Sequence, residues 1–94
     1  MTVKKVIFSN HAVQQMFQRN ISVGDVKFVL QNGIPVNEYP DDKPFPSKLL
    51  YAYCNNRNLH VVCSENYLED EIIVITAYEA TTDSWENDFV TRKK

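Results

Sequence analysis

The 94-residue sequence predicts an α+β fold in which two N-terminal helices pack on one face of an antiparallel sheet of three to five strands. Apolar residues recur with helical spacing within residues 9–32. Three segments rich in β-branched and aromatic residues follow a proline-rich stretch and read as strands. The length fits one domain, residues 1–94, and a hydrophobic content of 44% indicates a folded core.

The first helix is expected to follow an edge strand at residues 2–8. Ser9 is a suitable N-cap because its side-chain oxygen can accept a hydrogen bond from a backbone amide of the first turn. Arg19 falls at the border of the apolar arc. The pattern predicts an amphipathic helix that packs on one side. Its apolar arc consists of Ala12, Val13, Met16 and Phe17.

A second helix is expected over residues 21–32. Ser22 and Asp25 resemble a capping box at its start, and Gly33 fits a left-handed residue at its end. Phe28 lies off the apolar face, so it either rests on the neighbouring helix or is exposed for a partner. The apolar face consists of Val23, Val26, Val29 and Leu30.

The second half of the chain predicts strands separated by turns. All four prolines lie in residues 35–46, which predicts a surface loop after a short edge strand at 36–39. Strands are expected at 48–54, 59–64 and 71–78, with turns at 55–58 and 65–70. Trp85 and Phe89 are four residues apart, which suggests a short closing helix or turn that pins Trp85 onto the body.

Composition narrows the function classes. The net charge is −2, from 10 basic and 12 acidic residues, so the sequence lacks the basic excess typical of nucleic-acid binders. The total charge does not exclude a local basic groove. No apolar run is long enough to span a membrane, and the start of the chain does not resemble a secretory signal. Cys54 and Cys63 read as buried free thiols in a reducing, cytoplasmic compartment.

Strand alternation assigns side chains to two sheet faces. Apolar side chains of each strand are expected on the helix-covered face, and polar and aromatic ones on an open face. The expected covered positions are Leu50, Ala52, Cys54, Leu59, Val61, Cys63, Ile73, Ile75 and Ala77. The expected open positions are Lys48, Tyr51, Tyr53, His60 and Tyr78.

The open face is the best candidate for chemistry. The imidazole of His60 can move a proton near neutral pH, Arg19 and other cations can hold phosphate oxygens, and tyrosine rings can stack on bases. The candidate substrate-binding residues are Lys48, Tyr51, Tyr53, Arg57 and Tyr78.

A structural interpretation of the same residues stays open. The tyrosines can simply cover a sheet face while His60 bonds a neighbour. His11 can be a solvated side chain of the first helical turn, and Arg19 can bind carbonyls at the helix end. No metal-binding spacing, phosphate loop or nucleophile motif is present, so no cofactor and no metal are expected.

Four segments of the chain resemble domain-of-unknown-function family 4258. They are "FSNHAVQQMFQRNIS", "DVKFVLQNG", "LHVVCS" and "EIIVITAY…WENDF", and together they span roughly residues 7–92. The order and spacing of the segments carry the resemblance. The matching positions are His11, Arg19, Gly33, His60, Tyr78 and Trp85.

That family is similar to small bacterial toxins of the RelE/ParE and BrnT kind. The resemblance implies the toxin of a type II toxin–antitoxin pair, with two helices on an antiparallel sheet. It also implies an antitoxin partner of the zinc-finger, helix-turn-helix type. Related ribonucleases cut messenger RNA without metal, through attack of the 2′-hydroxyl on the adjacent phosphate.

Two functions from different classes are therefore expected. The first is a metal-independent mRNA endoribonuclease in which His60 transfers the proton and His11 is a second acid or base. Arg19 and Lys48 stabilise the charge that develops on the phosphate. The second is a non-catalytic binding module of the same fold. Its partner surface would comprise Phe28, the proline loop and the acidic segment 65–71, along which a basic antitoxin tail could lie. A homodimer is also possible.

Overall fold

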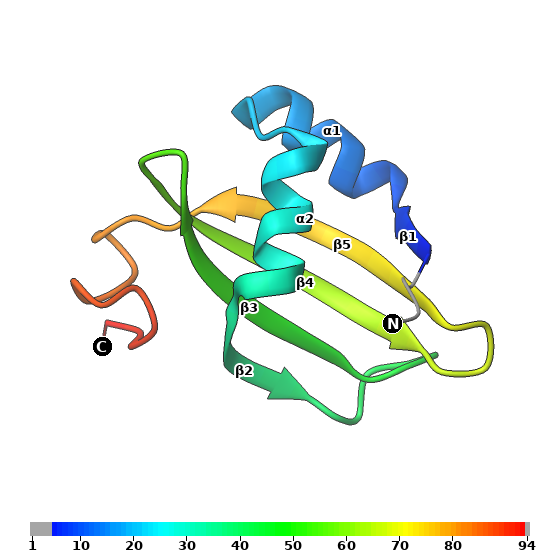
Figure 1. Cartoon of the computed structure of the whole chain (residues 1–94). Coiled ribbons are helices and arrows are strands. Elements are labelled where there is room, and N and C mark those ends of the chain that lie inside the picture. The colour runs from blue at the N-terminus through cyan, green and yellow to red at the C-terminus, as the bar shows by residue number, and fades with distance from the viewer. Residues whose placement is uncertain (1–4, 94) are drawn as a thin grey trace.

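Two helices cover one face of a five-stranded sheet in the computed structural model, which describes residues 5–93 (Figure 1). The strand β1 precedes both helices, and the other four strands follow them. The elements are β1 Lys5–Phe8, α1 Asn10–Arg19, α2 Val23–Asn32, β2 Ile34–Tyr39, β3 Ser47–Cys54, β4 Arg57–Asn66 and β5 Glu71–Glu79.

The expectation of an antiparallel sheet is wrong, because the sheet is mixed. The strand order is β1-β5-β4-β3-β2, and β1 runs parallel to β5 while the remaining pairs are antiparallel. Strands β2 to β5 form a meander, in which each short connection reverses the chain. The chain runs from β1 through the two helices before it enters the meander. The direction of β1 therefore depends on that two-helix crossover and not on the apolar pattern of β1 itself.

The helix starts follow the predicted capping chemistry. The amide of Ala12 donates to Ser9 Oγ at 3.0 Å, and Ser22 and Asp25 form a reciprocal capping box. Asn20, with φ of 56°, provides the left-handed residue that ends α1.

Gly33 was expected to be left-handed, which is wrong, since its backbone is extended with φ of −70°. A Cβ at Gly33 would lie 2.5 Å from the carbonyl oxygen of Val29 and 3.1 Å from that of Tyr51. Glycine therefore lets the chain leave α2 close to β3.

A bulge in β5 reverses part of the face assignment. Val62 pairs with Thr76 but Cys63 pairs with Val74, so Ile75 is an extra residue. Ala77 lies on the helix-covered face as predicted, whereas Ile73, across from Ser64, lies on the other face. Ile72 and Val74 replace the expected Ile73 and Ile75 against the helices.

The main core lies between the helices and the sheet. Ala12 and Met16 of α1 and Val26 and Val29 of α2 are buried in it. The predicted apolar arcs were too wide, however. The exposed fractions are 53% for Val13, 88% for Phe17, 48% for Val23 and 41% for Phe28.

The opposite face of the sheet is partly covered by the C-terminal segment, residues 80–93. This segment forms turns and no helix, and Trp85 pairs with Arg92 through an isolated bridge. Trp85 is buried with Leu49 and Ala80, and Phe89 packs against this second core. The expectation that the C-terminal segment pins Trp85 onto the body is confirmed.

Asp25 is the buried carboxylate that joins α2 to the sheet. Burial alone would raise the pKa of Asp25, but hydrogen bonds from the Ser22 amide, the Cys54 thiol and the Asn55 side chain, together with the nearby Ser22 side chain, outweigh it, so the pKa lies below its ordinary value. The carboxylate therefore stabilises the fold above about pH 4, the pKa range of an unfolded aspartate, and this contribution is lost as the pH falls through the lowered pKa.

Asp25→Asn should lower the free energy of unfolding by about 1–3 kcal/mol at pH 7, because an amide cannot accept the bonds that the carboxylate accepts from Ser22, Cys54 and Asn55. Urea denaturation measures the change. Asp41→Asn, in the proline loop, is the exposed control and should leave stability unchanged. An Asp25→Asn protein as stable as the wild type at pH 7 would contradict this role.

Candidate functional site

Three predicted site residues form a row across the middle of the sheet. Tyr51 pairs with His60 in the β3–β4 ladder, and His60 pairs with Tyr78 in the β4–β5 ladder. All three point away from the helices, as alternation predicts. The ring centroid of His60 lies 5.7 Å from that of Tyr51 and 5.2 Å from that of Tyr78.

The expectation that this row is open to solvent is wrong at His60, whose exposed fraction is 0%. The C-terminal segment lies over it. The ring of Trp85 meets the imidazole edge-on at 4.6 Å, and Phe89 stacks on Tyr51 at 6.2 Å. A substrate therefore cannot touch His60 while this segment is in place.

Hydrogen bonds fix the protonation of His60. The carbonyl of Phe89, 2.7 Å from Nε2, can only accept, so Nε2 carries the proton. Nδ1 then accepts from the hydroxyl of Tyr78 at 3.0 Å. Burial lowers the pKa of His60 below its ordinary value, although the bond to the Phe89 carbonyl partly opposes this. His60 is thus a neutral group that holds Tyr78 and the C-terminal segment.

Burial also keeps Tyr78 protonated. It raises the pKa of Tyr78, Tyr39 adds to the rise, and Arg92 and Arg19 partly oppose it. The phenol of Tyr78 is therefore a proton donor at neutral pH, and its ring is held by His60.

Arg19 reaches the outer edge of β5. Its Nη1 donates to the carbonyl of Ala77 at 3.0 Å. This carbonyl lies beyond the end of β1, whose last pair is Phe8 with Val74. A guanidinium has five N–H donors, so this bond leaves others to face solvent. Arg19 therefore holds the edge of β5 and can still donate hydrogen bonds to a ligand.

Arg57 instead uses its guanidinium for contacts within the fold. Its Nη1 donates to the carbonyl of Asn20 at 2.7 Å and its Nη2 to that of Arg19 at 2.8 Å. Its Nε pairs with Glu79 at 3.1 Å. Arg57 thus binds the C-terminal carbonyls of α1 and ties them to β4 and β5.

A shallow surface pocket brings these residues together. Its lining consists of Arg19, Arg57, Tyr78 and Glu79. Glu79 was missed by the sequence analysis. The signal for it was its place, directly after Tyr78 at the end of a strand.

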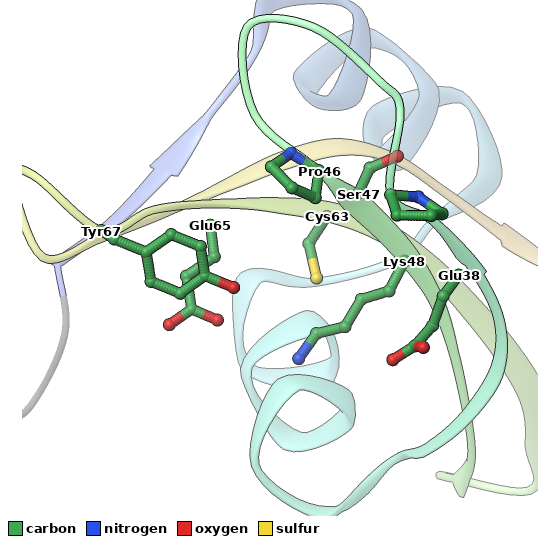
Figure 2. Close-up of a pocket in the computed structure, with 8 residues that line it drawn as sticks. Glu38, Pro46, Ser47, Lys48, Cys63, Glu65 and Tyr67 are labelled. Carbon is green, nitrogen blue, oxygen red and sulfur yellow. The ribbon is translucent and has the colours of Figure 1, made fainter.

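Lys48 lies at a different place from the Arg19 pocket. It was expected on the face of Tyr51, which is wrong, because it pairs with Cys63 and so projects on the helix-covered face. The position follows from alternation, since Lys48 and Leu50 are two residues apart. Figure 2 shows Lys48 beside Glu38 in a second pocket, with Cys63, Glu65 and Tyr67.

The remaining candidates are dispersed. His11 is exposed in the first turn of α1, roughly 12 Å along the helix from Arg19 at 1.5 Å per residue. Tyr53 is 59% exposed and bonds Asn56 in the β3–β4 turn, while Tyr51 donates to Asn58 at 2.7 Å. Cys54 and Cys63 are buried free thiols, as predicted.

Two classes of site have no support among residues 5–93. No group of three or more histidine, cysteine, aspartate or glutamate side chains is placed to hold a metal ion. None of the helices there has the length and apolar character needed to cross a membrane.

The fold and the pocket define a small α+β protein with cationic, acidic and phenolic groups at one sheet edge. The model for the family described as domain of unknown function (DUF4258) matches residues 8–79, so the chain belongs to this family. No curated protein and no solved structure matches the chain.

The lowered pKa of His60 has a consequence for stability. An unfolded histidine titrates near pH 6.5. Below that pH the unfolded chain therefore binds a proton at His60 more readily than the folded chain does. The free energy of unfolding should be at its full value above about pH 6.5 and fall as the pH drops below it. Denaturant titrations from pH 7.5 to 5 measure this.

His60→Gln should flatten that pH dependence, whatever its effect on absolute stability, and His11→Gln is the matched control. A wild-type pH dependence that persists in His60→Gln would show that another group causes it.

Proposed function

We propose that the chain is the toxin of a type II toxin–antitoxin pair and cuts messenger RNA without a metal ion. The observation that carries this proposal is the pocket of Arg19, Tyr78 and Glu79 at the open edge of β5. It combines a cation, a protonated phenol and a carboxylate, which can supply charge stabilisation, an acid and a base for cleavage of RNA by its own 2′-hydroxyl.

The chemistry assigns one role to each group. Glu79 accepts the proton of the 2′-hydroxyl as its oxygen attacks the adjacent phosphorus. Arg19 stabilises the added negative charge on the phosphate oxygens. Tyr78 turns its hydroxyl from His60 and donates its proton to the leaving 5′-oxygen. The products are a 2′,3′-cyclic phosphate and a free 5′-hydroxyl, so neither a metal nor an external water is needed for this step.

Two further residues position these groups without touching RNA. His60 holds the Tyr78 hydroxyl at 3.0 Å from Nδ1. Arg57 holds the end of α1, on which Arg19 lies, and its ion pair orients Glu79. In this proposal His60 is a positioning residue, and Arg57 binds no phosphate. Tyr53, exposed at the same end of the sheet, offers a ring for stacking against a base.

The proposed partner is a cognate antitoxin, and the proposed compartment is the cytoplasm. This part of the proposal rests on the resemblance to RelE/ParE-like and BrnT-like toxins that the sequence implies. The two buried free thiols are consistent with a reducing compartment.

Arg19→Gln, Glu79→Gln and Tyr78→Phe should each reduce RNA cleavage by about 10²–10⁴-fold, the usual contribution of such groups. The assay is cleavage of a labelled RNA by the purified protein in the presence of EDTA, with analysis of the cyclic-phosphate end. Because Glu79→Gln also weakens the contact with Arg57, the thermal stability of each variant is measured in parallel.

Lys48→Gln and His11→Gln are the matched controls, because both change a polar side chain outside the pocket. They should retain wild-type cleavage. Full activity of Tyr78→Phe and Glu79→Gln would refute the proposed roles, and cleavage that EDTA abolishes would refute the metal-independent mechanism.

A non-catalytic binding module is the second candidate. The observation that favours it is the acidic turn between β4 and β5, where the exposed fractions of Tyr67 and Leu68 are 69% and 86%. Exposed apolar side chains beside carboxylates fit a basic, partly apolar segment of a partner. Wild-type protein that neither cuts RNA nor arrests growth, yet binds a Lys/Arg-rich peptide through Leu68, would favour this candidate.

A further inference from the structure

The C-terminal segment brings a second guanidinium close to the candidate pocket. Arg92 lies over the ring of Trp85, with its Cζ 5.5 Å from the ring centroid. The ring of Trp85 meets that of His60 edge-on at 4.6 Å, and His60 Nδ1 accepts from the hydroxyl of Tyr78 at 3.0 Å. A continuous series of contacts therefore connects Arg92 to Tyr78, the phenol of the pocket.

The backbone around Arg92 is held in place. Trp85 and Arg92 pair through the isolated bridge, and the amide of Lys93 donates to the carbonyl of Ser84 at 2.9 Å. Trp85 is buried, whereas Arg92 is exposed. The indole therefore supports the guanidinium from the protein side and leaves its N–H donors at the surface. A cation that is positioned before a ligand arrives binds it at a lower entropic cost.

Neither Arg92 nor Arg19 has an acidic partner within the described chain. No carboxylate of residues 5–93 forms an ion pair with either guanidinium, whereas Arg57 pairs with Glu79. Asp88, the acid nearest to Arg92 in the sequence, uses its carboxylate within its own turn. The chain has 12 acids and 10 bases, so acids are not scarce. Two guanidiniums that stay unpaired in such a protein favour an anionic ligand.

The two cations approach Tyr78 from opposite faces of the sheet. Arg19 comes from α1 on one face, and Arg92 comes from the C-terminal segment on the other. Figure 1 shows the end of α1 and the C-terminal segment at the same end of β5, the arrowhead. Burial raises the pKa of Tyr78, and Arg92 and Arg19 both oppose this rise, so both positive charges act on one phenol.

We propose that Arg92 binds the phosphate on the 3′ side of the scissile phosphate in single-stranded RNA. The inference deepens the proposed function and rests on it for the identity of the ligand. In that function Tyr78 protonates the leaving 5′-oxygen, so the departing nucleotide lies on the Tyr78 side of the cut. The next phosphate then lies towards the C-terminal segment, where the guanidinium of Arg92 offers its donors.

RNA phosphates suit this pair of cations better than the carboxylates of an acidic protein. A phosphate recurs at every nucleotide, so one strand can reach Arg19 and Arg92 at the same time. The strand must bend around the edge of β5 to do so. A single strand bends easily, whereas a duplex is stiff over this length.

The test compares two substrates that differ by one phosphate. The first is an RNA dinucleotide of mixed sequence, whose single phosphate is the scissile one. The second is the same dinucleotide with an added 3′-terminal phosphate. The wild type should cleave the second with a kcat/KM about tenfold higher, as expected for a charge-assisted hydrogen bond to phosphate. Arg92→Gln should remove this preference.

Lys93→Gln is the matched control, because it removes an exposed positive charge from the neighbouring residue. It should keep the preference for the second substrate. Arg92→Lys keeps the charge but loses the planar group that stacks on Trp85, so it should keep only part of the preference. Fluorescence of Trp85, the one tryptophan of the chain, reports whether the C-terminal segment stays in place in each variant.

Binding is measured separately from cleavage. The probe is a fluorescein-labelled single strand of about ten nucleotides, a length within the usual range for single-strand sites. It contains deoxyribose throughout, so it lacks the attacking hydroxyl and cannot be cut. Fluorescence anisotropy at several salt concentrations gives the affinity. Arg92→Gln should lower the slope of log affinity against log salt by about 0.7, the value for one phosphate contact.

The outcomes separate this inference from the nuclease proposal. A substrate preference that survives in Arg92→Gln, or that Lys93→Gln loses as well, would overturn the inference. A glutamate-rich peptide that binds through Arg92 more tightly than the oligonucleotide would also overturn it, and would make a protein carboxylate the ligand. A wild type that binds the oligonucleotide through Arg92 but cuts neither substrate would refute the nuclease proposal and support the phosphate site.

Discussion

Strand β5 extends past the end of β1, and α1 binds the backbone groups that this leaves unpaired. The Ser9 amide donates to Val74 at 3.0 Å, the Ser9 hydroxyl donates to Ile75 at 3.1 Å, and Arg19 donates to Ala77 at 3.0 Å. Unpaired carbonyls at a sheet edge are costly to bury and invite pairing with other chains. The two ends of one helix thus protect the edge, and this fixes where α1 lies.

The placement of α1 decides what each side of the helix can do. The side of Arg19 lies at the edge of β5, beside Glu79 and Tyr78. The side of Phe17 is exposed among the residues that the structure describes. Arg57 reinforces the arrangement, because one guanidinium joins the end of α1 to β4 and to Glu79. The candidate pocket and the exposed apolar surface are therefore two results of the same anchoring.

Local signals in the sequence predicted the elements that depend on local chemistry. Ser9 and the Ser22–Asp25 pair mark the helix starts because capping involves residues three apart. Alternation placed Tyr51, His60 and Tyr78 on one face, since the side-chain period of a strand is two. Features set by distant parts of the chain were not predictable in this way. The direction of β1 depends on a two-helix crossover, and the burial of His60 depends on turns some 25–30 residues later that contain Trp85 and Phe89. The exposure of Val13 and Phe17 likewise depends on which elements lie beside α1, which the helical pattern does not encode.

The extra residue Ile75 changes which side chains of β5 face the helices before and after it. Before it, Ile72 and Val74 face the helices; after it, Ala77 does, and Tyr78 is turned towards His60. With the same sequence, a regular ladder that paired Ile75 like its neighbours would place Tyr78 on the same face as Ile72 and Val74, so either the phenol or the isoleucine–valine pair would lie in the wrong layer. The bulge is thus what allows this sequence to supply both the hydrophobic interior and the hydroxyl behind the pocket from one strand.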